Sequence, residues 1–230
     1  MSDHGLRTLR RELAGGGGPE EEAELLLAAL RAGALDPARV RLAARLGSAA
    51  AALIAAEHGW APAPSLAPHP TAAELIAWSE PLADAGREAA CRCGLALARL
   101  LLPEWERQSG RLHPRWRSPG TRGRPRLDPR PAELCHALEA WLRAPAPASE
   151  AALERAWAAC EEVTFLRPED WRARAGLTAV LVLLRAARAD PAGAVRLGHD
   201  ALHPHPAAAL LAALRAEVLP WALGQRDPLG

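Results

Sequence analysis

Residues that start and stop helices recur along this chain at the spacing of short helices, and they constrain the fold more than any other feature. The stretch "GPEEEAELLLAALRAG" (18–33) places Pro19 at a first helical turn, and three glutamates follow at the positive end of the helix dipole. Gly33 then allows the left-handed backbone that ends many helices. In "DPARVRLAARLG" (36–47), Asp36 can cap the free N–H groups of a second proline-initiated helix. The pattern predicts a series of short helices.

The same signals continue along the chain. Thr71 and Glu74 have the spacing of a capping box, in which each side chain accepts a hydrogen bond from the backbone of the other. The stretch "PLADAGREAACRCGLALARLLLPEW" (81–105) predicts one longer helix that begins at its first proline and ends near Pro103. The second half of 167–189 is apolar over a wide arc, which is typical of a central helix covered by its neighbours.

The composition of the apolar residues favours helices alone. Half of the 230 residues are apolar, and alanine and leucine dominate them, with one Phe and no Tyr. Strands depend on β-branched and aromatic residues, which are scarce here, whereas alanine and leucine are the best helix formers. We therefore predict an all-α protein of roughly nine to eleven helices, packed as an orthogonal bundle or as an irregular solenoid of helix pairs.

Proline-rich stretches divide the chain into parts. "WAPAPSLAPHP" (60–70) contains too many prolines to continue a helix, so we predict a linker there. This gives an N-terminal helical module (1–59), middle helices after the proline-rich linker (60–110), an arginine- and proline-rich loop (111–127) and a C-terminal helical bundle (128–230). The alternative is one continuous domain, which a chain of this length also allows.

The stretch "RLHPRWRSPGTRGRPRLDPRP" (111–131) contains seven arginines and a single carboxylate, Asp128. Its five prolines and two glycines exclude a continuous helix. We assign Asp128 to Pro131 to the start of the next helix, as a cap followed by proline. The earlier part is the surface that we expect to contact an acidic partner protein, and its predicted contact residues are Arg115, Trp116, Arg117, Arg122, Arg124 and Arg126.

Nucleic-acid binding through the same loop is an alternative, because arginine can contact phosphates while Trp116 stacks on bases. All 28 basic residues are arginine, as expected of a GC-rich genome, and 27 acidic residues reduce the net charge to +1. A chain with so little net charge has no overall field that attracts nucleic acid. We therefore rank a protein partner above nucleic acid.

A second alternative is metal binding near the C-terminus. In "HDALHPHP" (199–206), His199 and His203 are one helical turn apart and His205 lies just beyond. Two imidazoles at that spacing can bind zinc, with Asp200 as a further ligand or an orienting group. Pro204 breaks the helix, however, so a histidine-bearing helix end is the simpler interpretation. We predict no cofactor.

No sequence motif indicates an enzyme. The nucleophile elbow, the P-loop, the dinucleotide-binding glycines and the HExxH zinc motif are all missing. The four cysteines, Cys91, Cys93, Cys135 and Cys160, lie on alanine-rich predicted helices, where we expect reduced thiols that pack as small core residues. No apolar segment is long enough to span a bilayer, so we expect a cytoplasmic protein without membrane contact.

Two segments carry a resemblance to known groups of proteins. Residues 21–54 contain an acidic helix, "R-x-G-x-L" and "R-[LV]-x-L-A-A-x-L-G", and resemble a short motif of uncharacterised all-α proteins from GC-rich bacteria. The C-terminal half, from "DPRPAELCHALEAWL" onward, resembles immunity proteins of bacterial polymorphic-toxin systems, which are all-α and share the pattern "D-x-R-P-x-x-A-x-x-A-x-x-W". Asp128, Arg130, Pro131 and Trp141 follow that pattern approximately.

The second resemblance implies a function in binding and not in catalysis. It implies a non-enzymatic helical protein that binds another protein, as an immunity or accessory factor of a bacterial toxin system. The expected partner is then a cognate toxin or another acidic protein. This is the leading hypothesis, with nucleic-acid binding and metal binding as alternatives.

Overall fold

The computed structural model describes residues 18–61, 70–112, 128–165, 171–201 and 206–225. Within these ranges all regular structure is helical, and the eleven α-helices confirm the all-α prediction. The α-helices are α2 (Pro19–Arg31), α3 (Pro37–Arg45), α4 (Ala49–Glu57), α5 (Ala72–Ser79), α6 (Arg87–Leu112), α7 (Arg130–Arg143), α8 (Pro147–Glu161), α9 (Trp171–Ala187), α10 (Pro191–Ala201), α11 (Pro206–Glu217) and α12 (Leu219–Ala222). Two short 3₁₀ helices, η1 (Glu80–Ala85) and η3 (Glu162–Phe165), adjoin them.

Local capping explains where the early helices begin and end. Oδ1 of Asp36 accepts a hydrogen bond from the backbone N–H of Ala38 at 2.7 Å, and α3 ends before Gly47, whose φ is +96°. At the start of α5, the Glu74 N–H donates to Oγ1 of Thr71 at 3.2 Å, and the Thr71 N–H donates to Oε2 of Glu74 at 2.7 Å. The predicted caps and the capping box are confirmed.

The prediction of one helix over 81–105 is wrong at its N-terminal end. Residues Glu80–Ala85 form η1 instead, and Gly86 separates this 3₁₀ helix from α6. Gly86 has a φ of +91°, a conformation that other residues adopt only with strain, so the chain turns there before α6 begins. The change of direction leaves η1 and α6 as two elements.

The predicted stop near Pro103 is also wrong, because α6 continues through this proline to Leu112. A proline inside a helix removes one backbone hydrogen bond. The apolar face nevertheless runs on past it, since Leu101 and Trp105 on either side are 4% and 2% exposed. Burial of this face keeps the segment helical, so Arg111 lies in α6 and not in a loop.

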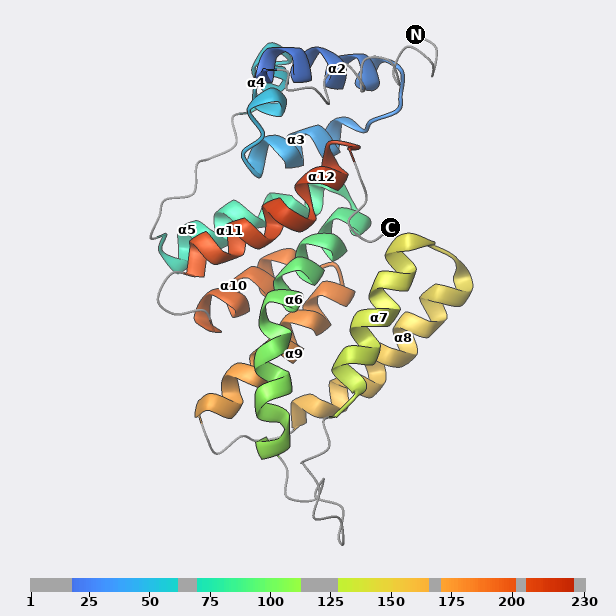
Figure 1. Ribbon diagram of the computed structural model, residues 1–230, viewed down its shortest axis with the longest axis vertical. Coiled ribbons are helices and arrows are strands. Elements are labelled where there is room, and N and C mark those ends of the chain that lie inside the picture. Colours follow the sequence, from blue (N-terminus) through green and yellow to red (C-terminus); the bar gives the residue numbers. More distant parts are fainter. Residues whose placement is uncertain (1–17, 62–69, 113–127, 166–170, 202–205, 226–230) are drawn as a thin grey trace, which may run out of the picture.

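Helix α6 lies at the centre of the molecule and packs along its length against α9, with α10 and α11 across it (Figure 1). Gly94 marks their close approach, because a Cβ built on it would lie 2.6 Å from the Cα of Ala186. The region 179–187 of α9 is buried on nearly all sides, as expected of a central helix. One continuous cluster of buried side chains joins elements from both halves of the chain.

The remaining helices lie around this centre. Helices α2, α3 and α4 pack at one end of the molecule, where α12 returns to contact α3, and α7 and α8 form a hairpin along one side (Figure 1). Four tryptophans of the described helices are buried: Trp78, Trp105, Trp141 and Trp221. Among the described residues, no helix combines the length and apolar character needed to cross a membrane.

Candidate functional site

The predicted partner-binding residues lie outside the described residues, in the segment between α6 and α7. They are Arg115, Trp116, Arg117, Arg122, Arg124 and Arg126. The structure describes the residues at the two ends of this segment. They are Leu112, at the end of α6, and Asp128, before α7.

Of the three histidines proposed as metal ligands, only His199 lies within the described residues. It is half-buried near the end of α10, while His203 and His205 fall in the gap before α11. The described ranges contain no group of three or more His, Cys, Asp or Glu residues that could hold a metal ion. Metal binding at this helix end therefore stays an untested alternative.

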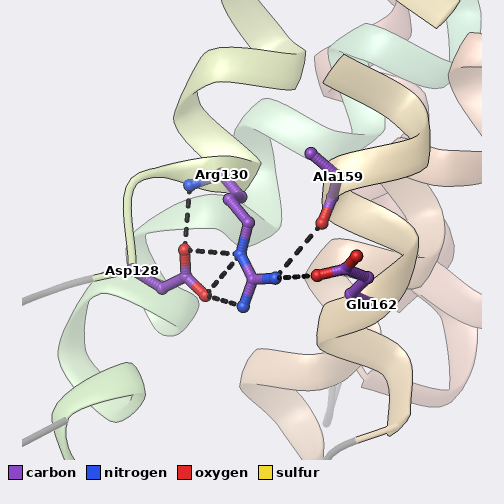
Figure 2. Close-up of polar contacts among 4 residues, drawn as sticks. All are labelled: Asp128, Arg130, Ala159 and Glu162. Atoms are coloured by element: carbon purple, nitrogen blue, oxygen red, sulfur yellow. Dashed lines mark hydrogen bonds and ion pairs between the residues drawn. The ribbon is translucent and has the colours of Figure 1, made fainter. Parts of the chain in front are cut away.

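A buried carboxylate marks the point where the arginine-rich segment joins α7 (Figure 2). The side chain of Asp128 is only 4% exposed. Its Oδ1 accepts hydrogen bonds from the backbone N–H of Arg130 at 3.0 Å and from Nε at 3.1 Å, while Oδ2 accepts from Nη2 at 2.7 Å. The carboxylate charge is therefore balanced by a guanidinium two residues further along the chain.

The same guanidinium ties α7 to the end of α8. Nη1 of Arg130 donates to the carbonyl oxygen of Ala159 at 3.3 Å and to Oε2 of Glu162 at 3.1 Å (Figure 2). The hydrogen bond that Arg130 donates to Asp128 is the main cause that raises the pKa of Arg130, and burial opposes it. We call Asp128, Arg130, Ala159 and Glu162 the α7 anchor; it holds the chain that leaves the arginine-rich segment against two helices.

The sequence predicts a helix start at Asp128 to Pro131, which includes Arg130, but not the bonds of the Arg130 guanidinium. The hydrogen bonds between Asp128 and Arg130 are local, so the D-x-R spacing was a usable signal for them. The contacts to Ala159 and Glu162 lie 29 and 32 residues away and carry no signal in the sequence.

A second polar cluster joins α6, α7 and α11. Oε1 of Glu139 accepts a hydrogen bond from Nη2 of Arg99 at 2.9 Å, and the other side of the guanidinium bonds to Glu217. Burial raises the pKa of Glu139, but the hydrogen bond and the charge of Arg99 outweigh it, so this pKa lies below its ordinary value. This cluster holds the three helices together. Its central pair, Arg99 and Glu139, is not open to a ligand, because each charge is already paired with the other.

The four cysteines are free and buried, as the sequence indicated. Burial is the main cause that raises their pKa, to about 11 for Cys91 and to about 12 for Cys93, Cys135 and Cys160. A nucleophilic cysteine requires the thiolate, and these thiols stay protonated near neutral pH. They act as small core residues.

The chain matches no family model, no curated protein and no solved structure.

Proposed function

We propose that this chain is a non-enzymatic helical protein that binds an acidic partner protein, as an immunity or accessory factor of a bacterial toxin system. The binding segment is the arginine-rich stretch 111–127, whose first two residues are the last two of α6. The single observation that supports this most is the α7 anchor, in which Asp128 is buried and bonded to Arg130 where the segment ends. Binding segments gain affinity when their ends are held in place, because less conformational entropy is lost on binding.

The composition of the segment supports a protein partner. Between Arg111 and Leu127 it contains six arginines, one tryptophan and no carboxylate. Arginine and tryptophan are the residue types enriched among the side chains that dominate protein interfaces. The rest of the chain is acidic enough to bring the net charge to +1, which disfavours a partner as strongly charged as nucleic acid.

Co-expression with the product of each neighbouring gene, followed by size-exclusion chromatography with light scattering, tests the proposal. The test variant replaces Arg115, Arg117 and Arg122 with serine. The matched control replaces three exposed arginines on other elements, Arg31, Arg155 and Arg196, with serine, so that both variants lose the same charge. We expect a stoichiometric complex that the control retains and the test variant loses.

Two outcomes would count against the proposal. If both variants bind the partner equally well, the segment is not the contact surface. The second test is a gel shift with duplex DNA at moderate salt. If the wild type and the control bind DNA and the test variant does not, the segment binds nucleic acid instead.

A further inference from the structure

A cavity of about 250 Å³ lies between α3, α4 with the chain that follows it, and η1. Its volume is just below the range of about 300–1,000 Å³ that is typical of pockets for drug-sized ligands, so it suits a smaller molecule. Apolar and charged side chains share its lining, among them Leu42, Ala55, Pro81, Arg41, Arg45 and Asp84.

Arg45 is the half-buried cation of this cavity. Its Nη1 donates to the carbonyl oxygen of Trp78 near the C-terminal end of α5 at 3.0 Å, and it forms no ion pair with a described carboxylate. Burial lowers the pKa of Arg45, and the charge of Asp84 opposes this only in part. A guanidinium has five N–H donors, so Arg45 keeps donors that an anion in the cavity could use.

Arg41 precedes Arg45 by one helical turn, and both line the cavity. Its guanidinium carbon lies 5.3 Å from the centroid of the Trp60 ring, and it too has no ion pair with a described carboxylate. Three other arginines of the described helices are neutralised by carboxylates, since Arg87, Arg99 and Arg188 pair with Glu150, Glu139 and Glu154. Arg41, which is exposed, and the half-buried Arg45 have no such pair with a described carboxylate.

We propose that this cavity is a binding site for a small organic carboxylate that also carries a hydroxyl or ammonium donor. The two guanidiniums bind the carboxylate, because arginine matches the geometry of a carboxylate better than any other cation. Asp84 accepts the hydrogen bond from the ligand's donor group. Leu42, Ala55 and Pro81 contact its carbon atoms. With two positive groups and one negative group, the lining favours a ligand of net negative charge.

Isothermal titration calorimetry on the full chain tests this site with L-glutamate and L-malate as probes. Succinate, which lacks the hydroxyl or ammonium donor, and inorganic phosphate are the comparisons. The variant Arg41→Gln removes one cation from the rim, and Ala38→Leu fills the cavity without changing its charge. Arg155→Gln, an exposed arginine on α8, is the matched control.

We expect at least one of the two acids to bind, with an affinity that Arg41→Gln lowers by about tenfold. Ala38→Leu should abolish binding, whereas Arg155→Gln should leave it unchanged. A crystal structure with the bound acid would place its carboxylate against Arg45. The proposal is overturned if neither acid binds at millimolar concentration, if succinate or phosphate binds equally well, or if the Ala38→Leu variant binds as the wild type does.

Discussion

At the start of α7, the guanidinium of Arg130 is shared between two carboxylates in different surroundings. Asp128 is almost fully buried, whereas the side chain of Glu162 is 73% exposed. A buried acceptor that loses its donor cannot turn to water, so its hydrogen bonds carry most of the free energy of this cluster. An exposed ion pair contributes little, because water competes for both charges.

Asp128→Asn should therefore lower the free energy of unfolding by about 2 kcal/mol, since the new amide places a donor against the donors of Arg130. Urea denaturation followed by circular dichroism measures this. The control Glu162→Gln should cost less than about 1 kcal/mol. If both variants lose the same free energy of unfolding, the buried carboxylate contributes no more to stability than the exposed one.

Glu139 should make stability depend on pH in the acid range. Its side chain is 14% exposed, and its pKa in the folded protein lies below the ordinary value because Arg99 outweighs the effect of burial. A lowered folded pKa adds stability that is present above the unfolded pKa of about 4.3 and is lost as the pH falls through the folded pKa.

Urea denaturation as a function of pH measures this dependence. Glu139→Gln should flatten the loss of stability below about pH 4.5. The control Glu106→Gln, an exposed glutamate on α6, should leave the wild-type profile unchanged. A profile for Glu139→Gln that follows the wild type throughout would contradict the assignment.

At the scale of elements, the contact between α6 and α9 depends on a residue without a side chain. A Cβ at Gly94 would lie 2.6 Å from both the Cα and the Cβ of Ala186, and backbone atoms of a packed helix cannot move aside cheaply. The two central helices can approach this closely only with glycine at position 94.

Gly94→Ala should consequently lower the free energy of unfolding by about 1–3 kcal/mol, although alanine is the better helix former by about 1 kcal/mol. Gly198→Ala is the matched control, because a Cβ on this helical glycine meets only terminal methyl groups, of Leu210 at 3.2 Å and of Leu101 at 3.9 Å. Thermal unfolding should show a lower midpoint for the first variant and a nearly unchanged one for the second. A stabilised Gly94→Ala protein would contradict the close approach.

Tryptophan and arginine also join elements that are distant in the sequence. The guanidinium carbons of Arg39 and Arg92 lie 4.2 Å and 4.7 Å from the centroid of the Trp221 ring. These residues come from α3, α6 and α12, so one aromatic ring links the N-terminal helices, the central helix and the C-terminal helix. Cation–π contacts of this kind gain strength when they are partly desolvated.

At the scale of the whole molecule, the continuous core predicts a single unfolding transition. Leu46 lies beside α3 and Leu138 lies in α7, and both are fully buried members of the same cluster. Calorimetry should show that Leu46→Ala and Leu138→Ala each lower the midpoint of one shared transition, at a cost of about 2–5 kcal/mol. Leu53→Ala, at a position 44% exposed, should have little effect. Two transitions that respond separately would indicate independent halves.

The sequence alone determined the fold class and most helix starts. Caps such as Asp36, and the pair Thr71 and Glu74, act through hydrogen bonds between residues two or three positions apart, so the local sequence contains all the participants. For the same reason, the bond between Asp128 and Arg130 was within reach of sequence analysis. The candidate contact residues around Trp116 remain a prediction from composition.

The tertiary structure decided what depends on residues far apart in the chain. Helix α6 continues past Pro103 because buried neighbours cover its apolar face, and Gly94 is needed because α9 lies against it. Arg130 reaches Glu162 only because α7 and α8 form a hairpin, and the cavity exists only because α3 packs beside η1. Packing energy comes from surfaces that folding brings together, so a local sequence pattern cannot specify it.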